Sequence, residues 1–341
     1  MAGPVLSRVG RGLVALIPVA FLAGLVVWPL VAVFERSLAD AGIGDAIETL
    51  ARPSVLRVLW FTLWQAALSA ALTLLIGLPV AQVLARYRFR GRGALRALVI
   101  VPFVLPTVVV AAAVGTAFER IGLGFERSVP AVLAAHVFFN LAVVVRVVGG
   151  YWAGLDRRQV EAAMILGSSP LRAWWSITMR QLLPVLSGSF LLVFLFSFTS
   201  FGVIRVLGGL RRATIETEIH RYAIARQEFD VAAVLAALQI LVVVVLALAT
   251  ARFQRRYAAP NRRPAQRLPV TGPLRRLHLG LVIVAVLTVI GLPVAVLVEQ
   301  SLRVGTGYGL DNYQALFERV DLLPLSAADA LVNSLVFAAA A

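Results

Sequence analysis

The sequence contains no cysteine and no lysine, and only 14% of its residues are charged. Without cysteine the chain has no disulfide, no thiolate metal site and no thiol nucleophile. Without lysine it has no phosphate-binding loop of the kind that ATPases use, because that loop needs its lysine to reach the terminal phosphates. The three histidines, His136, His220 and His278, are too scattered to form a zinc pair on one helix. The sequence therefore gives no support to an ATPase site, a catalytic residue or a metal site.

Apolar residues dominate what is present. The chain is 60% hydrophobic with a mean hydropathy of +0.89, which is far too apolar for a soluble domain of 341 residues. Its net charge of +15 comes from 32 basic residues that are all arginine. These arginines fall in short clusters between apolar runs, not along a continuous basic face with aromatic residues, so they indicate membrane topology and not nucleic-acid binding.

The apolar residues form runs long enough to cross a bilayer. A helix that spans a hydrocarbon core of about 30 Å needs roughly 20 apolar residues. Seven complete runs lie at about 13–34, 58–85, 97–118, 129–150, 183–201, 231–250 and 277–298. An eighth run begins near Ala328 and reaches Ala341. The sequence therefore predicts an all-α, polytopic bundle of transmembrane helices. Pro102 and Pro106 predict a kink in the third run.

Arginine counts assign the loops to sides, because short loops rich in basic residues stay in the cytoplasm. Clusters precede the first run, follow the second at 86–96 and follow the sixth at 252–276, and alternation places all three on one side. We therefore expect a cytoplasmic N-terminus. The segment 202–230 carries five arginines against four acids, yet the alternation requires it to lie outside.

The chain contains an internal repeat. Residues 29–38 at the end of the first run match residues 293–302 at the end of the seventh in proline, glutamate, serine and leucine. Transporters commonly place their pathway between two such repeats. We expect a first module of six helices at 1–256, a cytoplasmic linker rich in Arg and Pro at 257–276, and the start of a second module at 277–341. If the two copies match, roughly 180 further residues are expected after Ala341.

A distinctive segment joins the fourth and fifth runs, at 151–182 on the predicted cytoplasmic side. Residues 157–166 suit a short helix, Gly167 suits the left-handed cap that ends it, and Pro170 suits the first turn of a second helix. Glu161 is followed by the two small residues Ala162 and Ala163, against which another protein can pack closely. An ordinary amphipathic connector would not require this agreement of side, turn chemistry and spacing.

This segment resembles the cytoplasmic loop of ATP-binding-cassette (ABC) importer permeases. The resemblance rests on Glu161, Ala162, Ala163, Gly167 and Ile177, and it departs at residues 179–180, where Met and Arg replace the usual Leu-Pro. It implies the type I importer permease fold and a loop that docks on the ATPase. It also implies two ATPase subunits, which would carry ATP and Mg, and an external solute-binding protein.

The resemblance extends along the chain, and further short sequences in it bear on which solute is transported. Short sequences at 136–140, 207–209 and 214–216 and the double-module layout look like the thiamine and ferric-iron permeases, with 136–140 leaning toward thiamine.

Polar residues inside the runs are candidates for the solute path. Gln65 and Ser69 belong to a polar stripe at helical spacing in the second run, which should face protein or water. His136 and Asn140 lie one turn apart on the fourth run. Two interpretations stay open for these four residues, namely packing between helices and lining of the path.

Two other classes of protein would share some of these features. A secondary transporter driven by an ion gradient would explain the spans and the repeat, but it predicts intramembrane acids, which the runs lack. A structural membrane scaffold would leave the loop around Glu161 unexplained.

Overall fold

The computed structural model describes residues 16, 18–21, 23–122, 127–209, 212–257, 267–318 and 326–340. Within them, five helices are long and apolar enough to cross a membrane, and a bent pair of helices makes a sixth candidate. The five are α3 (Pro53–Arg86), α6 (Val129–Ala153), the stretch Pro170–Phe198, α12 (Phe229–Tyr257) and the stretch Pro273–Leu302. They agree with the second, fourth, fifth, sixth and seventh predicted runs, so the all-α polytopic bundle is confirmed.

Three helices form the centre of the bundle: α3, α6 and α9 (Arg180–Phe198) pack against one another. The contact between α3 and α6 is close because it uses small residues. A Cβ atom added at Gly77 on α3 would lie 2.7 Å from Val144 Cγ1 on α6, and Gly149 of α6 lies against Ala81 of α3. Helices in membranes associate through such small-residue contacts, because lipid gives them no hydrophobic force toward each other.

The third predicted run is a broken helix and not a single kinked span. Helix α4 (Arg92–Val104) and helix α5 (Thr107–Arg120) meet at an angle of 112° around Leu105 and Pro106. Pro106 lacks the amide hydrogen that would continue the helix, and its ring disfavours helical geometry at Leu105, which is extended at φ −68° and ψ 139°. Pro102 stays inside α4. The sequence therefore located the break correctly but underestimated its size.

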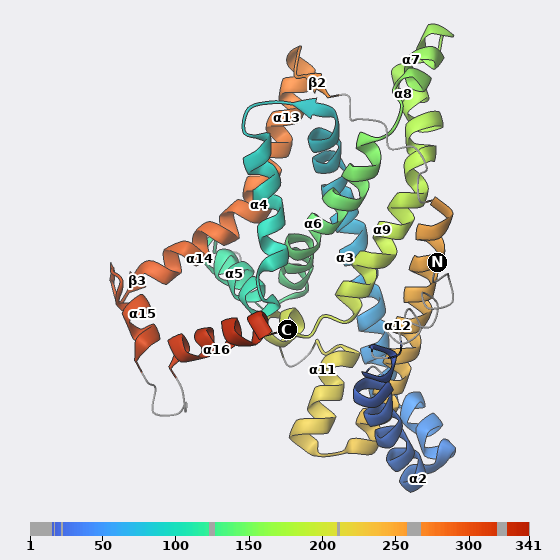
Figure 1. The fold of residues 1–341 in the computed structure, drawn as a ribbon, viewed down its shortest axis with the longest axis vertical. Coiled ribbons are helices and arrows are strands. Elements are labelled where there is room, and N and C mark those ends of the chain that lie inside the picture. Colours follow the sequence, from blue (N-terminus) through green and yellow to red (C-terminus); the bar gives the residue numbers. More distant parts are fainter. Residues whose placement is uncertain are drawn as a thin grey trace, which may run out of the picture.

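The first predicted run lies partly outside the described residues, since 1–15, 17 and 22 are not described. Its later part is the π-helix η1 (Ala23–Val27) followed by α2 (Trp28–Ala51). Helix α2 continues well beyond residue 34 and is interrupted only at Gly42, which has a φ of +62°. It packs against α12, at the end of the bundle that also holds α11 (Ile215–His220) and the π-helix η3 (Arg221–Arg226), as Figure 1 shows.

A short parallel strand pair connects two arginine-rich loops at the opposite end. Strand β1 (Tyr87–Arg88) pairs with β2 (Leu268–Pro269), so that Arg88 lies opposite Pro269. The loop after the second span and the loop after the sixth therefore lie at the same end, as the arginine counts predicted. Residues 258–266 of the predicted linker lie outside the described residues. The segment 212–230 lies at the other end with α11, which agrees with the expected alternation (Figure 1).

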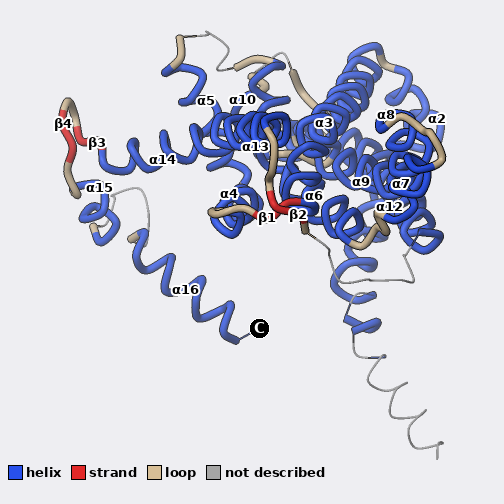
Figure 2. Tube along the Cα trace, turned by 90° about the horizontal axis from the view of Figure 1, so that it is seen from above, coloured by secondary structure: helices blue, strands red, loops and turns tan. Residues whose placement is uncertain are grey.

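The predicted start of the second module packs on the first. Helix α13 (Pro273–Val286), the π-helix η4 (Leu287–Gly291) and helix α14 (Leu292–Leu302) form one long bent element that contacts α4, α5 and α6. At its far end Arg120 of α5 forms an ion pair with Glu299 of α14, which also accepts a hydrogen bond from Tyr308 Oη. The remaining elements extend from the bundle in Figure 2 and are β3 (Arg303–Val304), β4 (Gly307–Tyr308), α15 (Asp311–Gln314), the 3-10 helix η5 (Ala315–Phe317) and α16 (Ala327–Ala340).

Candidate functional site

The predicted helix, turn and helix between α6 and α9 is present, and we call it the elbow (residues 156–179). Its first helix, α7 (Arg158–Ile165), is followed at the cap by Gly167, whose φ of +91° is left-handed. The amide of Ser168 donates to the carbonyl of Ala163 at 2.9 Å, and the amide of Gly167 donates to the carbonyl of Met164 at 3.0 Å. These two bonds form a Schellman motif, which satisfies carbonyl groups that a helix end would leave without partners.

The second helix of the elbow begins at the predicted proline, but it does not end before the fifth span. Ser169 caps α8 (Pro170–Ala173) by accepting a hydrogen bond from the Arg172 amide at 3.3 Å, and Pro170 occupies the first helical turn. The chain then continues through the π-helix η2 (Trp174–Met179) directly into α9, with Pro184 inside that helix. The departure from the family pattern at residues 179–180 therefore creates no break, and the elbow is one piece with the fifth span.

Charged and polar contacts hold the elbow in shape. Arg157 and Glu161 form an ion pair at 3.3 Å across one turn of α7, and the side chain of Glu161 is still 56% exposed. The carboxylate of Asp156 accepts a hydrogen bond from the Arg158 amide at 3.0 Å, at the start of α7. Glu161 is therefore positioned by Arg157 and open to a partner at the same time. The sequence could have shown this ion pair through the i, i+4 spacing.

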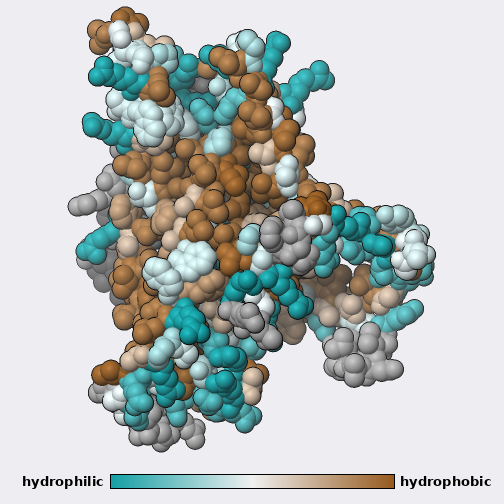
Figure 3. Space-filling view, turned by 180° about the vertical axis from the view of Figure 1, so that it is seen from behind, coloured by the Kyte–Doolittle hydropathy of each residue, from teal (hydrophilic) through white to brown (hydrophobic). Residues whose placement is uncertain are grey.

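The tip of the elbow presents apolar side chains to its surroundings. Ile165 and Leu166 are each 86% exposed, and Leu171 and Trp175 are more than half exposed. None of the residues of α7 is buried. In Figure 3 hydrophobic residues lie at this tip, with hydrophilic residues below them on the visible face. Ala162 is exposed beside it, so the small-residue surface predicted next to Glu161 is accessible. An exposed apolar patch rimmed by polar residues marks an interaction site.

The four candidate path residues come together in the interior of the bundle. Gln65, Ser69, His136 and Asn140 are each at most 2% exposed. Ser69 Oγ lies 2.9 Å from His136 Nδ1, which joins α3 to α6. Gln65 Nε2 donates to the carbonyl of Ser197 at 3.1 Å, and Asn140 Nδ2 donates to Ser197 Oγ at 3.4 Å, so both also reach α9. The polar stripe therefore faces protein and not lipid.

Ser197 is the member of this buried cluster that the sequence analysis missed. It lies on α9, far from α3 and α6 in the sequence, and a serine inside an apolar run carries no signal of its own. Three atoms of the cluster, Gln65 Oε1, His136 Nε2 and Asn140 Oδ1, have no hydrogen-bond partner among the described residues. The cluster clearly joins three helices, and a contact with solute stays a prediction.

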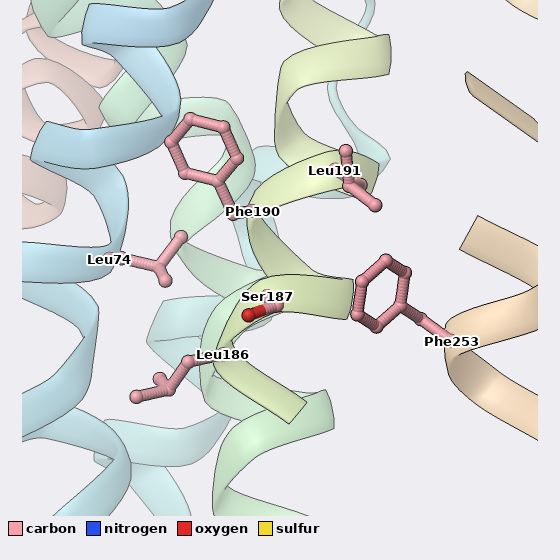
Figure 4. Close-up of a pocket in the computed structure, with 6 residues that line it drawn as sticks. All are labelled: Leu74, Leu186, Ser187, Phe190, Leu191 and Phe253. Atoms are coloured by element: carbon pink, nitrogen blue, oxygen red, sulfur yellow. The ribbon is translucent and has the colours of Figure 1, made fainter. Parts of the chain in front are cut away.

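A separate groove of about 370 Å³ lies between α3, α9 and α12. Figure 4 shows its lining of Leu74, Leu186, Phe190, Leu191 and Phe253, with Ser187 as the polar exception. Such a lining suits hydrocarbon or another apolar helix and offers little to a polar solute. None of the four candidate path residues lines this groove. Within the described residues, histidine and acidic side chains form no group of three that could hold a metal ion.

Comparison with known proteins identifies the class of this fold. A family model described as "Binding-protein-dependent transport system inner membrane component" matches residues 73–259, which include the elbow and His136, Asn140 and Ser197 of the buried cluster. The chain belongs to this family. It is therefore an ABC importer permease subunit, a multi-pass component of the bacterial inner membrane.

Individual relatives of this permease differ in what their names say they transport. It is 37% identical to the molybdenum transport system permease protein ModB of Mycobacterium tuberculosis over 212 residues, which cover 58% of this chain and 77% of ModB. It is 32% identical to the thiamine transport system permease protein ThiP of Brucella abortus over 273 residues, which cover 73% of this chain and 48% of ThiP. The permease thus spans about half the length of the thiamine relative.

A solved structure shows the same fold. The permease matches a chain in the crystal structure of a bacterial ABC transporter that imports the acidic polysaccharide alginate, with a TM-score of 0.61 and 18% identity. The match covers 74% of this permease and 98% of that chain. The type I importer permease fold is therefore confirmed.

Proposed function

We propose that this permease forms part of the path by which a small solute enters the cytoplasm, and that it takes its energy from ATP hydrolysed by separate subunits. The observation that carries this proposal is the elbow, a helix-turn-helix with an exposed apolar tip. Two ATPase subunits would hold ATP and Mg, and one of them would receive Glu161, Ala162, Ala163 and Gly167. An extracytoplasmic binding protein would deliver the solute to the other end. The elbow would then lie in the cytoplasm, together with the N-terminus.

The exposed tip explains why a partner is needed. Full burial of one large aliphatic side chain is worth about 1.5 to 3 kcal/mol. In the isolated chain Ile165 and Leu166 gain almost none of this burial free energy, because each is 86% exposed. A groove on the ATPase would recover this energy, and the polar rim with Glu161 would set the orientation. Because α8, η2 and α9 are continuous, a displacement of the tip would be passed to the fifth span.

The domain layout and the cargo form the finer part of the proposal. We assign residues 1–256 to a first module, 257–276 to a linker and 277–341 to the start of a second module. The thiamine relatives support this layout, since their match extends over 73% of the chain. They also favour thiamine as cargo, with ferric iron as the other candidate from the motifs. The names of other relatives make molybdenum and sulfate the competing cargoes.

The test of the proposed function targets the tip. Replacing Ile165 and Leu166 together with serine (Ile165→Ser/Leu166→Ser) removes apolar area that the chain itself does not bury, so folding should be unaffected. We expect capture of the cognate ATPase subunit by the purified permease to weaken at least about ten-fold, which corresponds to about 1.4 kcal/mol. The matched control is Leu274→Ser/Leu277→Ser, which alters two exposed leucines at the same end but outside the elbow.

Two results would contradict the proposal. One is equal capture of the ATPase by the tip variant and the native permease. The other is solute uptake that persists after ATP depletion while a proton gradient remains, which would favour a secondary transporter. Cargo is tested separately, by measuring ATPase stimulation with the binding protein loaded with thiamine, ferric iron or molybdate.

A further inference from the structure

A second surface, this one charged, lies at the same end as the elbow but outside it. Strands β1 and β2 bring together two loops that are distant in the sequence. We call the exposed arginines around them the arginine clip, which consists of Arg88, Arg90, Arg96, Arg267, Arg275 and Arg276. Figures 1 and 2 place β2 and the start of α13 on a different side of this end from α7 and α8.

The backbone of the clip is held by a seventh arginine. Arg92 donates from Nε and Nη2 to the carbonyl of Leu84, at 3.0 and 2.7 Å, which folds the loop after α3 back on the helix end. Arg96 and Arg267 are near enough for their charges to repel the Arg92 guanidinium. The fold therefore brings together arginines from two loops that are distant in the sequence.

Between described residues, no ion pair joins a carboxylate to a clip arginine. The acids at this end are Asp156 and Glu161, and both belong to the elbow, where they contact elbow residues. A cluster of this kind repels itself unless an anion lies against it.

The surface next to the clip identifies the anion. On α13, Leu274, Leu277 and Leu281 recur at helical spacing and are each at least 60% exposed, directly after the clip residues. On α4, Ile100 and Val104 are exposed on the turns that follow Arg96. On both helices, exposed arginines are followed by exposed apolar side chains. An anionic lipid is complementary to this order, because its charged headgroup would meet the arginines and its hydrocarbon chains the apolar residues. An acidic protein surface would not require the exposed leucines.

We propose that the arginine clip is a binding site for the phosphate headgroups of anionic phospholipids. Arginine suits this role because its planar guanidinium can give two parallel hydrogen bonds to phosphate oxygens. The site clamps the loop after α3 to the linker before α13. Lipid binding there would therefore stabilise the junction between the two predicted modules. This inference does not depend on ATPase docking at the elbow.

The test measures lipid selectivity of the full-length protein in vesicles of phosphatidylcholine. Spin-labelled phosphatidylglycerol and spin-labelled phosphatidylcholine report the ratio of their association with the protein surface. We expect a several-fold preference for phosphatidylglycerol in the native protein, which falls toward unity in Arg88→Gln/Arg90→Gln/Arg275→Gln/Arg276→Gln. The matched control removes four other exposed arginines at the same end, in Arg158→Gln/Arg172→Gln/Arg180→Gln/Arg252→Gln, and should keep the preference.

Additional variants and salt conditions distinguish lipid binding at the clip from other causes of a changed preference. If the quadruple clip variant does not insert, Arg275→Gln/Arg276→Gln alone should still lower the ratio, whereas the quadruple lysine variant should keep most of it. About 1 M NaCl, where the screening length is about 3 Å, should reduce the native preference. Equal losses in clip and control variants would overturn the site. So would abolition of the preference by inorganic phosphate at matched ionic strength, or a clip variant that keeps the preference but loses the ATPase.

Discussion

Gly167 shows how one residue fixes the geometry of the elbow. Its φ of +91° is a conformation that a side chain disfavours, and a Cβ atom added there would meet no other atom within 4 Å. The cost of a substitution at Gly167 therefore comes from the backbone alone. It amounts to roughly 1 to 2 kcal/mol for an ordinary residue in the left-handed region. Asparagine tolerates that region better than a β-branched residue does.

We predict that Gly167→Val shifts the elbow away from its native turn and weakens ATPase capture about ten-fold. Gly167→Asn should retain most of the native affinity. Gly93→Val is the matched control, because Gly93 is exposed at the same end, has an ordinary φ and also faces open space. The affinity of the purified permease for the ATPase, measured by surface plasmon resonance, checks the order of the three variants. Native affinity in Gly167→Val would show that the turn is not needed.

Residue types alone predict the elbow well and the buried cluster only in part. Gly167 and Pro170 carry local backbone requirements, so the turn can be predicted from neighbouring residues. Gln65 and Ser69 show by their spacing that one face of α3 is buried. Their partner Ser197 cannot be found that way, because its role comes from a contact between helices that are distant in the sequence.

At the scale of elements, the contact between α3 and α6 depends on the missing side chain of Gly77. Val144 is fully buried, and its Cγ1 would lie 2.7 Å from a Cβ atom at position 77. We predict that Gly77→Ala forces the two helices apart and destabilises the permease by about 1 to 3 kcal/mol. Thermal unfolding of the purified protein in detergent should show a lower midpoint.

Two further variants make this prediction specific. Gly150→Ala adds a methyl group where no atom lies within 4 Å, so its midpoint should stay near the native value. Val144→Ala combined with Gly77→Ala should destabilise less than the sum of the two single changes, because the clash is relieved. Additive losses in the double variant would mean that Gly77 and Val144 do not press on each other.

Two features that the sequence does not predict are the pairing of β1 with β2 and the size of the bend after α4. Strands β1 and β2 have two residues each, which is too short for any periodic pattern. The apolar run 97–118 continues on both sides of Pro106, so its hydropathy does not show a turn of 112°. The angle depends on packing as well as on Pro106, since α5 lies against α6, α10 (Gly202–Leu207) and α14.

For the whole molecule, the arrangement of the two ends follows from the sequence more completely than the individual contacts do. Arginine clusters placed the loops after the second and sixth spans on one side, and the pairing of Arg88 with Pro269 agrees. The hydrogen bond from Arg86 Nη1 to the carbonyl of Leu155, at 3.4 Å, adds the residues just before the elbow to the same end. The two copies of the sequence repeat differ in structure, because the helix of the first copy, α2, continues to Ala51 whereas that of the second, α14, ends at Leu302.

This arrangement makes a prediction about sidedness that a chain without cysteine can test cleanly. Arg172 on α8 and Ala225 on η3 are both exposed. In Figure 1, α8 lies at the opposite end of the bundle from α11, which η3 contacts. If basic loops stay in the cytoplasm, Ala225→Cys should react with a membrane-impermeant maleimide in intact cells. Arg172→Cys should react only after the cells are opened. Labelling of Arg172→Cys in intact cells would place the elbow outside, where no ATPase could reach it, and would refute the proposed coupling.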